Sequence, residues 1–395
     1  MDALTTPSNW QRVRLGDVAE IKRGASPRPI ENPKWFCANS NVGWVRISDI
    51  SKNSRFLYKT AQKLSKKGIE KSRFIKQNSL IMSMCTTIGK PIITKIDTCI
   101  HDGFVVFENP KIDLNYLYYF LCYIEKEWLE SGQQGSQVNL NVDLIKNKEV
   151  FYPKDLNEQI AIANILSDVD RYLYTLDALI LKKESVKKAL SFELLSQRKR
   201  LKGFNQAWQK VKLGDIGKPC MCKRVMKHQT TRYGEIPFYK IGTFGNTADA
   251  FISKKLFLEY KTKYSFPKKG DILISASGTI GRAVIYDGKP AYFQDSNIVW
   301  IDNDETLVKN DFLFYVYSHV KWNTEHTTIL RLYNDNFKNT LIPLPPLNEQ
   351  IAIANILSAL DHEIISLKNK KRQFENIKKA LNHDLMSAKI RVLKK

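Results

Sequence analysis

Apolar residues recur at alternating spacings of four and three in two long segments, which is the heptad pattern of a coiled-coil seam. Both segments are highly charged and contain no internal proline. At 1.5 Å per residue, about forty helical residues span on the order of 60 Å, more than the face of a domain of about 150 residues. We therefore expect the two helices to pack on each other, with packing of each on its own domain as the alternative. The seam positions are Ile162, Leu166, Val169, Leu173, Leu176, Ile180, Leu190 and Leu194 in the first segment, and Ile353, Leu357, Leu360, Ile364, Leu367, Phe374, Leu381 and Leu385 in the second, where Lys371 and Lys378 interrupt them.

The same twelve residues, Leu-Asn-Glu-Gln-Ile-Ala-Ile-Ala-Asn-Ile-Leu-Ser, head both predicted helices, at 156–167 and again at 347–358. Proline lies shortly before each copy, and Asp155 or Asn157 can cap the first helix. An identity of this length cannot come from composition. It indicates two similar halves, each with a variable front part and a helical back part.

Short apolar runs alternate with turn residues in both front parts, which is typical of β-strands. A short aromatic helix closes each front part, at 114–121 and 311–317, and we interpret its aromatic side chains as core. The pattern predicts the α+β class, with domains at 1–155 and 204–346 and helices within 156–203 and 347–395. The clearest expected strands are 42–47, 79–83 and 103–107 in the first half, and 236–241, 271–275 and 297–301 in the second.

Positive charge is the main compositional feature, with a net charge of +22 at pH 7. This favours a polyanion as partner, and nucleic acid is the commonest one, although a lysine-rich solvated surface is the alternative. No apolar run approaches a membrane span and the N-terminus has no signal-peptide core, so we expect a cytoplasmic protein without membrane contact. The six cysteines form no paired framework, which fits a reducing compartment. Cys220 and Cys222, with His228 nearby, make a poor zinc site because a second thiol pair is missing.

Basic and polar loops differ between the halves while the framework is shared, as two readers of different sequences would require. Lysine and arginine contacts to phosphate position a protein on DNA, whereas contacts to base edges discriminate. The glutamine-rich loop at 131–139 is of interest because Gln and Asn can bond two edge atoms of adenine at once, although a flexible surface loop is equally consistent with its composition. The candidate DNA contacts are Lys22, Arg23, Ser26, Arg28, Arg46, Ser48, Lys90, Gln134, Ser136, Gln137 and Asn139 in the first half, and Lys223, Arg224, Lys240, Thr243, Arg282, Arg331 and Tyr333 in the second.

Motifs for catalysis are missing from the sequence. It contains no phosphate-binding glycine-lysine motif, no dinucleotide fingerprint, and no convincing Asp and Glu-x-Lys nuclease set. Residues 344–347 lack the Asn or Asp that amino-methylating enzymes place before two prolines. We predict no catalytic residue and no metal ligand. For the polar run 295–297 the sequence offers no physical account.

Three recurring motifs make the chain similar to the specificity subunit of a type I restriction-modification system. They are Trp-x-x-Val-x-Leu-Gly-Asp at 10–17 and 208–215, Ser-x-x-x-Thr-Ile-Gly at 83–89 and 275–281, and the duplicated helix-heading sequence. The resemblance covers essentially the whole chain. It implies two α/β target-recognition domains and an antiparallel coiled coil between them.

The resemblance also implies a role and partners. The chain would bind double-stranded DNA and assemble with two methyltransferase subunits and with motor-nuclease subunits. It would bind no cofactor directly, since S-adenosylmethionine, ATP and Mg²⁺ would belong to those partners. The helix-heading residues would contact the partner subunits, namely Asn157, Glu158, Gln159, Asn348, Glu349 and Gln350.

Our interpretation is a non-catalytic reader of a split DNA target whose helices set the gap between the two half-sites. Two alternatives remain at this point. One is the recognition part of a related DNA methyltransferase or nuclease, which the missing cofactor motifs disfavour. The other is a coiled-coil adaptor that does not bind DNA, which salt-dependent DNA binding would exclude.

Overall fold

The structure is a computed structural model that describes residues 8–52, 55–131, 140–322, 331–332 and 334–392. The chain divides into two compact units, one of residues 1–177 and 370–395 and the other of residues 178–369. The division falls inside both long helices, so each unit is a recognition domain together with part of each helix. The ends of both helices supply core residues to the units, and the predicted domain bounds stay a prediction.

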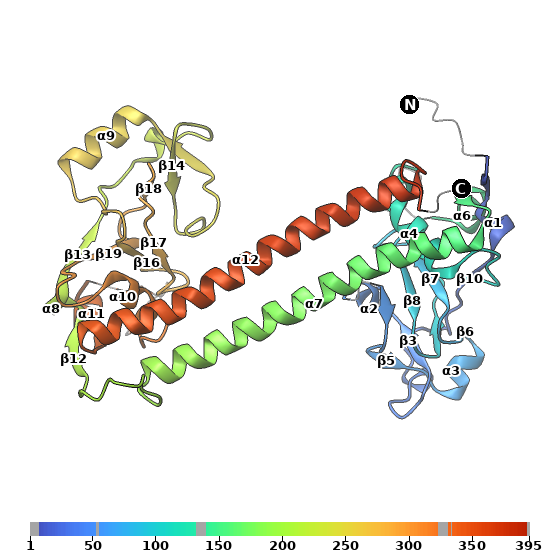
Figure 1. The fold of residues 1–395 in the computed structure, drawn as a ribbon, viewed down its shortest axis with the longest axis horizontal. Helices are drawn as coiled ribbons and strands as arrows, with labels where there is room; N and C mark the ends of the chain where they lie inside the picture. Colours follow the sequence, from blue (N-terminus) through green and yellow to red (C-terminus); the bar gives the residue numbers. More distant parts are fainter. Residues whose placement is uncertain (1–7, 53–54, 132–139, 323–330, 333, 393–395) are drawn as a thin grey trace. The chain divides into compact units, whose positions relative to one another are not determined.

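Two sheets, with a short ribbon beside them, form the first unit (Figure 1). The larger sheet has the order β2-β10-β7-β8-β4, the smaller has the order β5-β3-β9-β6, and β1 pairs with β11. Neighbouring strands are antiparallel except in the pairs β3–β9 and β4–β8. The strands are β1 (Trp10–Arg14), β2 (Glu20–Arg23), β3 (Gly43–Val45), β4 (Phe56–Leu57), β5 (Gln62–Lys63), β6 (Arg73–Ile75), β7 (Leu80–Ser83), β8 (Pro91–Thr94), β9 (Thr98–Ile100), β10 (Phe104–Glu108) and β11 (Glu149–Pro153). The short helices are α1 (Leu15–Val18), η1 (Pro33–Trp35), α2 (Ile47–Ser51), α3 (Lys66–Glu70), α4 (Leu114–Tyr123), α5 (Glu125–Ser131) and α6 (Val142–Asn147).

The second unit repeats this plan. Its larger sheet has the order β13-β19-β16-β17, its smaller sheet has the order β15-β14-β18 with β14 and β18 parallel, and β12 pairs with β20. The strands are β12 (Gln209–Lys212), β13 (Gly217–Met221), β14 (Ile236–Tyr239), β15 (Ala250–Ile252), β16 (Ile272–Ser275), β17 (Ala283–Ile285), β18 (Tyr292–Phe293), β19 (Ile298–Asn303) and β20 (Leu341–Leu344). The short helices are α8 (Leu213–Ile216), η2 (Lys227–Gln229), α9 (Lys254–Lys263), α10 (Asn310–Tyr317) and α11 (Asn334–Asn339).

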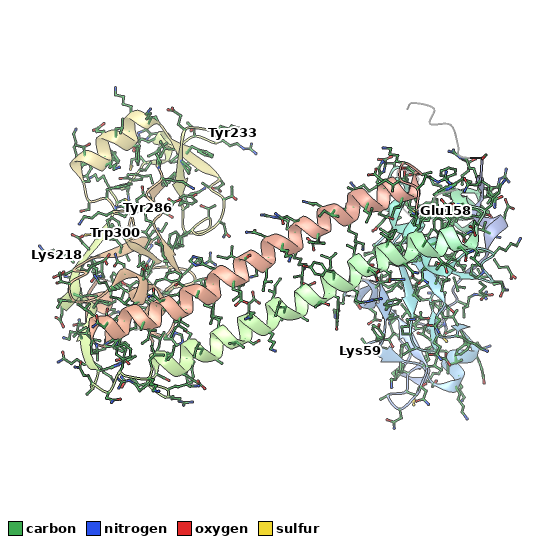
Figure 2. The ribbon with its side chains drawn as sticks, viewed as in Figure 1. Lys59, Glu158, Lys218, Tyr233, Tyr286 and Trp300 are labelled. Atoms are coloured by element: carbon green, nitrogen blue, oxygen red, sulfur yellow. The ribbon has the colours of Figure 1, made fainter. Side chains whose placement is uncertain are left out.

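The strands and aromatic helices expected from the sequence are confirmed. All six expected strands are present, within a few residues of the predicted bounds, as β3, β7, β10, β14, β16 and β19. Aromatic residues of α4 and α10 are buried, among them Tyr116, Tyr119, Phe312 and Tyr317, so their interpretation as core is also confirmed. Tyr286 and Trp300 lie in the same way inside the second unit (Figure 2).

The two long helices are α7 (Leu156–Leu195) and α12 (Leu347–Met386), and they run antiparallel within each unit (Figure 1). In the first unit Lys378 pairs with Asp170 at 2.5 Å and Lys371 with Asp177 at 2.6 Å. The lysines that interrupt the apolar seam therefore lie on the shared face, where acidic residues of α7 neutralise them. In the second unit the pairs are Lys187–Asp361 at 2.5 Å, Lys183–Glu363 at 2.8 Å and Lys368–Glu184 at 2.6 Å.

A membrane-spanning helix is not found among the described residues: none of their helices is both long and apolar enough.

Candidate nucleic-acid interface

In each unit the chain crosses from the smaller sheet to the larger one through a short polar segment. In the first unit this crossing is 101–103, between β9 and β10, and in the second it is 294–297, between β18 and β19. The loop that follows the edge strand of the larger sheet, β2 or β13, lies against this crossing. Gly24 N–H, for example, donates to the Phe104 carbonyl at 2.8 Å, and Ala25 N–H donates to that of Ile100 at 3.1 Å. Residues about 75 positions apart in the sequence thus meet at one edge.

Asp102 organises the first crossing. Its carboxylate accepts from Ser26 Oγ at 2.8 Å and from Arg28 Nη2 at 2.7 Å, and its backbone carbonyl accepts from Arg23 Nε at 2.7 Å. The pKa of Asp102 lies below its ordinary value. Partial burial alone would raise this pKa, but the hydrogen bond from Ser26 and the charge of Arg28 lower it by more. Three of the predicted DNA contacts therefore bond one residue that the sequence did not single out, two of them through its carboxylate and Arg23 through its backbone carbonyl.

His101, beside Asp102, is a neutral side chain at pH 7. Burial lowers its pKa to about 4, with the Asp102 charge opposing the shift and Arg46 adding to it. The imidazole Nδ1 accepts from the N–H of Gly103 at 2.9 Å, so the ring proton lies on Nε2. Although His101 Nδ1 and Asp102 Oδ1 are only 3.8 Å apart, the neutral ring makes no ion pair. Trp44 lies 5.9 Å from the His101 ring, and Arg46 extends over Trp44 while donating to Gln62 at 3.0 Å.

Asp295 takes the corresponding position in the second crossing. Its carboxylate accepts from Arg224 Nε at 2.9 Å, and its side chain is 15% exposed whereas that of Arg224 is 68% exposed. Asn297 accepts from Ser277 Oγ at 2.7 Å, and Ser277 forms an isolated bridge with Arg331. This is the physical account of the run 295–297 that the sequence lacked.

The other candidate contacts are more scattered. Lys22 pairs with Glu108 at 2.6 Å and with Glu20 at 2.9 Å, and Ser48 lies exposed on α2. Lys90 lines a cavity of about 850 Å³ with residues of α4, α5, α7 and α12, and the Asp102 cluster is not part of that lining. Gln134, Ser136, Gln137, Asn139 and Tyr333 lie outside the described residues.

In the second unit the scattered candidates are held by local bonds. Lys240 pairs with Asp249 at 2.8 Å, and its N–H donates to Thr243 Oγ1 at 3.1 Å. Arg282 Nη1 donates to the Phe244 carbonyl at 3.0 Å. Lys223 extends over the ring of Tyr264 at 5.1 Å. Among the described residues, no hydrogen bond joins these four side chains to Asp295.

The Thr-Ile-Gly turns have a structural role. Gly89 and Gly281 have φ of +76° and +82°, and a Cβ on either would meet a tryptophan ring, Trp128 at 2.3 Å or Trp322 at 2.1 Å. In each turn the serine hydroxyl donates to the threonine carbonyl, Ser83 to Thr87 and Ser275 to Thr279. The motif thus closes a hairpin against a tryptophan, Trp128 buried and Trp322 partly buried, which explains its recurrence without a DNA contact.

Four of the six helix-heading residues predicted to contact partner subunits have buried side chains with bonds inside their own unit. Glu158 is buried at the start of α7 (Figure 2), where it accepts from Asn9 at 2.9 Å, Trp10 at 3.2 Å and Arg391 at 3.2 Å. Glu349 accepts in the same way from Trp208 at 2.8 Å and from two nitrogens of Arg200 at 3.0 Å.

The glutamines complete the same internal arrangement. Gln159 accepts from the N–H of Asp113, and Gln350 accepts from that of Lys309, both at 2.8 Å, so each ties its long helix to the residue that begins the aromatic helix. Both side chains are buried. Glu158, Gln159, Glu349 and Gln350 thus bond inside their own units, whereas Asn157 and Asn348 are exposed; a partner contact at any of the six stays a prediction.

Chemistry beyond binding has no support in these sites. No group of three or more His, Cys, Asp or Glu among the described residues could hold a metal ion. Cys222 is buried, which raises the pKa of its thiol to about 12, so it is a poor metal ligand or nucleophile. The site geometry is that of exposed guanidinium groups held by carboxylates, which suits the recognition of acceptor atoms on a polyanion.

The family is decided by a sequence model described as the type I restriction modification DNA specificity domain, which matches residues 7–184 and again residues 205–376. The chain belongs to this family. It is 59% identical over 165 residues to a putative type I restriction enzyme specificity subunit of Haemophilus influenzae, S.HindORF215P, a match that covers 42% of this chain and 43% of that protein. It is 28% identical over 418 residues to the putative MjaX specificity subunit of Methanocaldococcus jannaschii, covering 98% of this chain and 95% of that protein.

Solved structures agree with this assignment at the level of the fold. The S subunit of a type I restriction-modification system from M. genitalium has a TM-score of 0.60 at 16% identity, covering 98% of this chain and 97% of that one. A chain from a structural study of type I complex assembly has a TM-score of 0.61, also at 16% identity, covering 97% and 98%. The type I specificity resemblance drawn from the sequence is thus confirmed: the chain has two target-recognition domains, and specificity subunits are the non-catalytic DNA-recognition components of their systems.

Proposed function

We propose that each unit reads one half of a split double-stranded DNA target. The observation that carries this proposal is the pair of matched crossings, where a duplicated scaffold presents Arg23 and Arg28 in one half and Arg224 in the other. The framework around the crossings is shared, while the loops on it differ in length and charge. Two differing readers on one scaffold suit a target of two different half-sites, and a net charge of +22 supplies the phosphate attraction that both need.

The partners we infer are two methyltransferase subunits and motor-nuclease subunits, which would carry S-adenosylmethionine, ATP and Mg²⁺, in the cytoplasm. Support comes from the family and from the duplication, since two similar halves offer two similar docking surfaces. Asn157 and Asn348, exposed at matched positions at the starts of α7 and α12, are the helix-heading residues that remain as candidate contacts.

Methylome sequencing tests the proposal directly. A host that expresses this chain with its cognate methyltransferase subunits should acquire methylated adenines in one split motif with two specified halves. Exchanging residues 1–155 for the equivalent region of a relative should change one half only. A motif that is continuous, or that changes in both halves, would contradict the reading by two independent units.

DNA binding by the purified assembly gives a second test. Binding should weaken steeply with salt, because lysines and arginines displace counterions from the phosphates. Lack of any salt-dependent binding to mixed DNA would favour the coiled-coil adaptor instead.

A further inference from the structure

At the second crossing, Arg224 is held in place through one of its nitrogens, and its other two nitrogens remain open to a ligand. Arg224 uses Nε to bond Asp295, and among the described residues its two terminal nitrogens make no hydrogen bond. The fork of a guanidinium group matches the O6 and N7 acceptors of guanine in the major groove. Because the carboxylate fixes the plane of the fork before DNA arrives, less conformational entropy is lost on binding.

The first crossing has the same arrangement at matched positions. Ser26 and Arg224 each lie nine residues after the aspartate of the shared Leu-Gly-Asp sequence, Asp17 or Asp215, and each bonds the crossing aspartate. In the first half the serine occupies one carboxylate oxygen and Arg28 the other, while Arg23 is fixed through Nε by the backbone carbonyl. The duplication has thus kept the aspartate and changed the side chains it holds.

An arginine beside a carboxylate suits a base edge better than a phosphate. The pair is nearly neutral, so it adds little to the attraction for the DNA backbone, and the carboxylate would repel a phosphate brought within a few ångströms. A guanine edge carries no net charge and offers two acceptors to the fork. An exposed lysine without a carboxylate beside it keeps its full charge and is better placed for phosphate.

We propose that Asp102 and Asp295 are matched positioning residues, which hold Arg28 with Arg23 and Arg224 so that each half of the target is read at a guanine. This inference rests on the proposed function, since it names the base class that the same crossings read.

The test uses the full chain assembled with its methyltransferase subunits and DNA carrying the motif obtained by methylome sequencing. Each position of both half-sites is varied singly, and binding is measured at two salt concentrations. The variants are Asp295→Asn and Asp102→Asn, each of which removes a charge, and Arg224→Lys, which keeps the charge but loses the fork. The matched control is Asp302→Asn, the same substitution at the other end of β19, where Asp302 pairs with the exposed Lys268 at 3.0 Å.

We expect Arg224→Lys to reduce discrimination at one G·C pair of the second half-site by roughly 5- to 150-fold, the range of a good bidentate contact. The first half-site and the salt dependence should be unchanged. Asp295→Asn should act at the same base pair, and Asp302→Asn should change nothing. Asp102→Asn should act at one base pair of the first half-site only.

Other results would overturn the inference. They are equal weakening of all sequences by Arg224→Lys, the same effect from Asp302→Asn as from Asp295→Asn, or a second half-site without any specified G·C pair. Because Arg224 is exposed, its lysine variant stays informative even if Asp295→Asn fails to fold. Failure of the unaltered assembly to bind DNA in a salt-dependent way would overturn the proposed function instead.

Discussion

Two buried glutamates hydrogen-bond residues that are distant in the sequence and so join separate parts of each unit. Glu349 is 1% exposed and is bonded by Arg200 and Trp208, which lie 149 and 141 residues away in the sequence. A buried carboxylate of this kind stabilises the fold only while its donors are present, because desolvating the charge costs several kcal/mol. The same holds for Glu158, whose donors come from the N-terminal strand region and from Arg391.

Replacement of Glu349 by Gln should therefore destabilise the second unit. The charge-assisted bonds to Arg200 and Trp208 are lost or weakened, and we expect a loss of about 1.5–3 kcal/mol in the free energy of unfolding. Thermal or urea unfolding measures it. Glu149→Gln is the control, because the Glu149 side chain forms an exposed ion pair with Arg12, which should contribute less than about 1 kcal/mol. Equal effects from the two variants would contradict the buried role of Glu349.

His101 gives the stability of the first unit a dependence on pH. Its folded pKa, lowered to about 4 by burial, lies below the ordinary value of 6.5, so the unfolded chain takes up the proton first as the pH falls. The contribution of His101 to the free energy of unfolding is fully present above pH 6.5 and is lost as the pH falls from 6.5 to 4. The loss from pH 7 to pH 5 is about 2 kcal/mol. In His101→Gln, the drop in unfolding free energy over this range should be smaller by that amount, and an unchanged drop would contradict the assignment.

At the scale of elements, the Ser-x-x-x-Thr-Ile-Gly hairpins show how one glycine sets the position of a tryptophan. Gly281 combines positive φ with a Cβ site 2.1 Å from Trp322, whereas Gly270 has a φ of +95° and no heavy atom within 4 Å. The two glycines therefore separate the cost of a left-handed backbone from the cost of steric overlap.

Alanine at Gly270 should cost about 1 kcal/mol, from backbone strain alone. Alanine at Gly281 should cost about 1–3 kcal/mol more, because the tryptophan must shift in a packed core. Unfolding of each variant measures the difference, and Gly242→Ala, with open space and no positive φ, is the neutral reference. If Gly281→Ala lowers the free energy of unfolding no more than Gly270→Ala does, the close approach of Gly281 to Trp322 does not constrain this position.

Local periodicity made the elements predictable from the sequence, whereas the crossings were not. The heptad spacing and the apolar runs depend on neighbours a few residues apart, so α7, α12 and the six strands could be placed. Asp102 meets Ser26 across 76 residues and Asp295 meets Arg224 across 71, and no local pattern reports such a contact. The duplication could have predicted the bonds of Glu158 and Glu349. A tryptophan and a glutamate recur at matched positions in both halves, and this recurrence fits an internal hydrogen bond as well as it fits a docking surface.

At the scale of the whole molecule, the unit boundaries pass through both long helices, so any change of helix length acts on both recognition domains. The ion pairs fix the register of the antiparallel pair within each unit, for example Lys378 with Asp170 and Lys187 with Asp361. A one-sided insertion would break this register. A whole heptad inserted in both helices keeps the seam in phase.

We expect seven residues inserted after Leu181 in α7, together with seven after Ser366 in α12, to lengthen the gap in the recognised motif. Each helix grows by about 10 Å at 1.5 Å per residue, which is about three base pairs of DNA. Methylome sequencing of a host that expresses the variant measures the new gap. An unchanged gap in an active assembly would show that the helices do not set it.

The placement of Arg391, Leu385 and Met386 in the first unit has a consequence for how the chain is made on the ribosome. Leu385 and Met386 are buried in the core of that unit, and Arg391 bonds Glu158 and Asn9. All residues of the second unit, 178–369, emerge before this last segment does. During synthesis the domain translated first must therefore wait for the final residues to complete its core, while the domain translated later can finish earlier. A chain released prematurely after residue 369 would keep every residue of the second unit and leave the first unit with an open core.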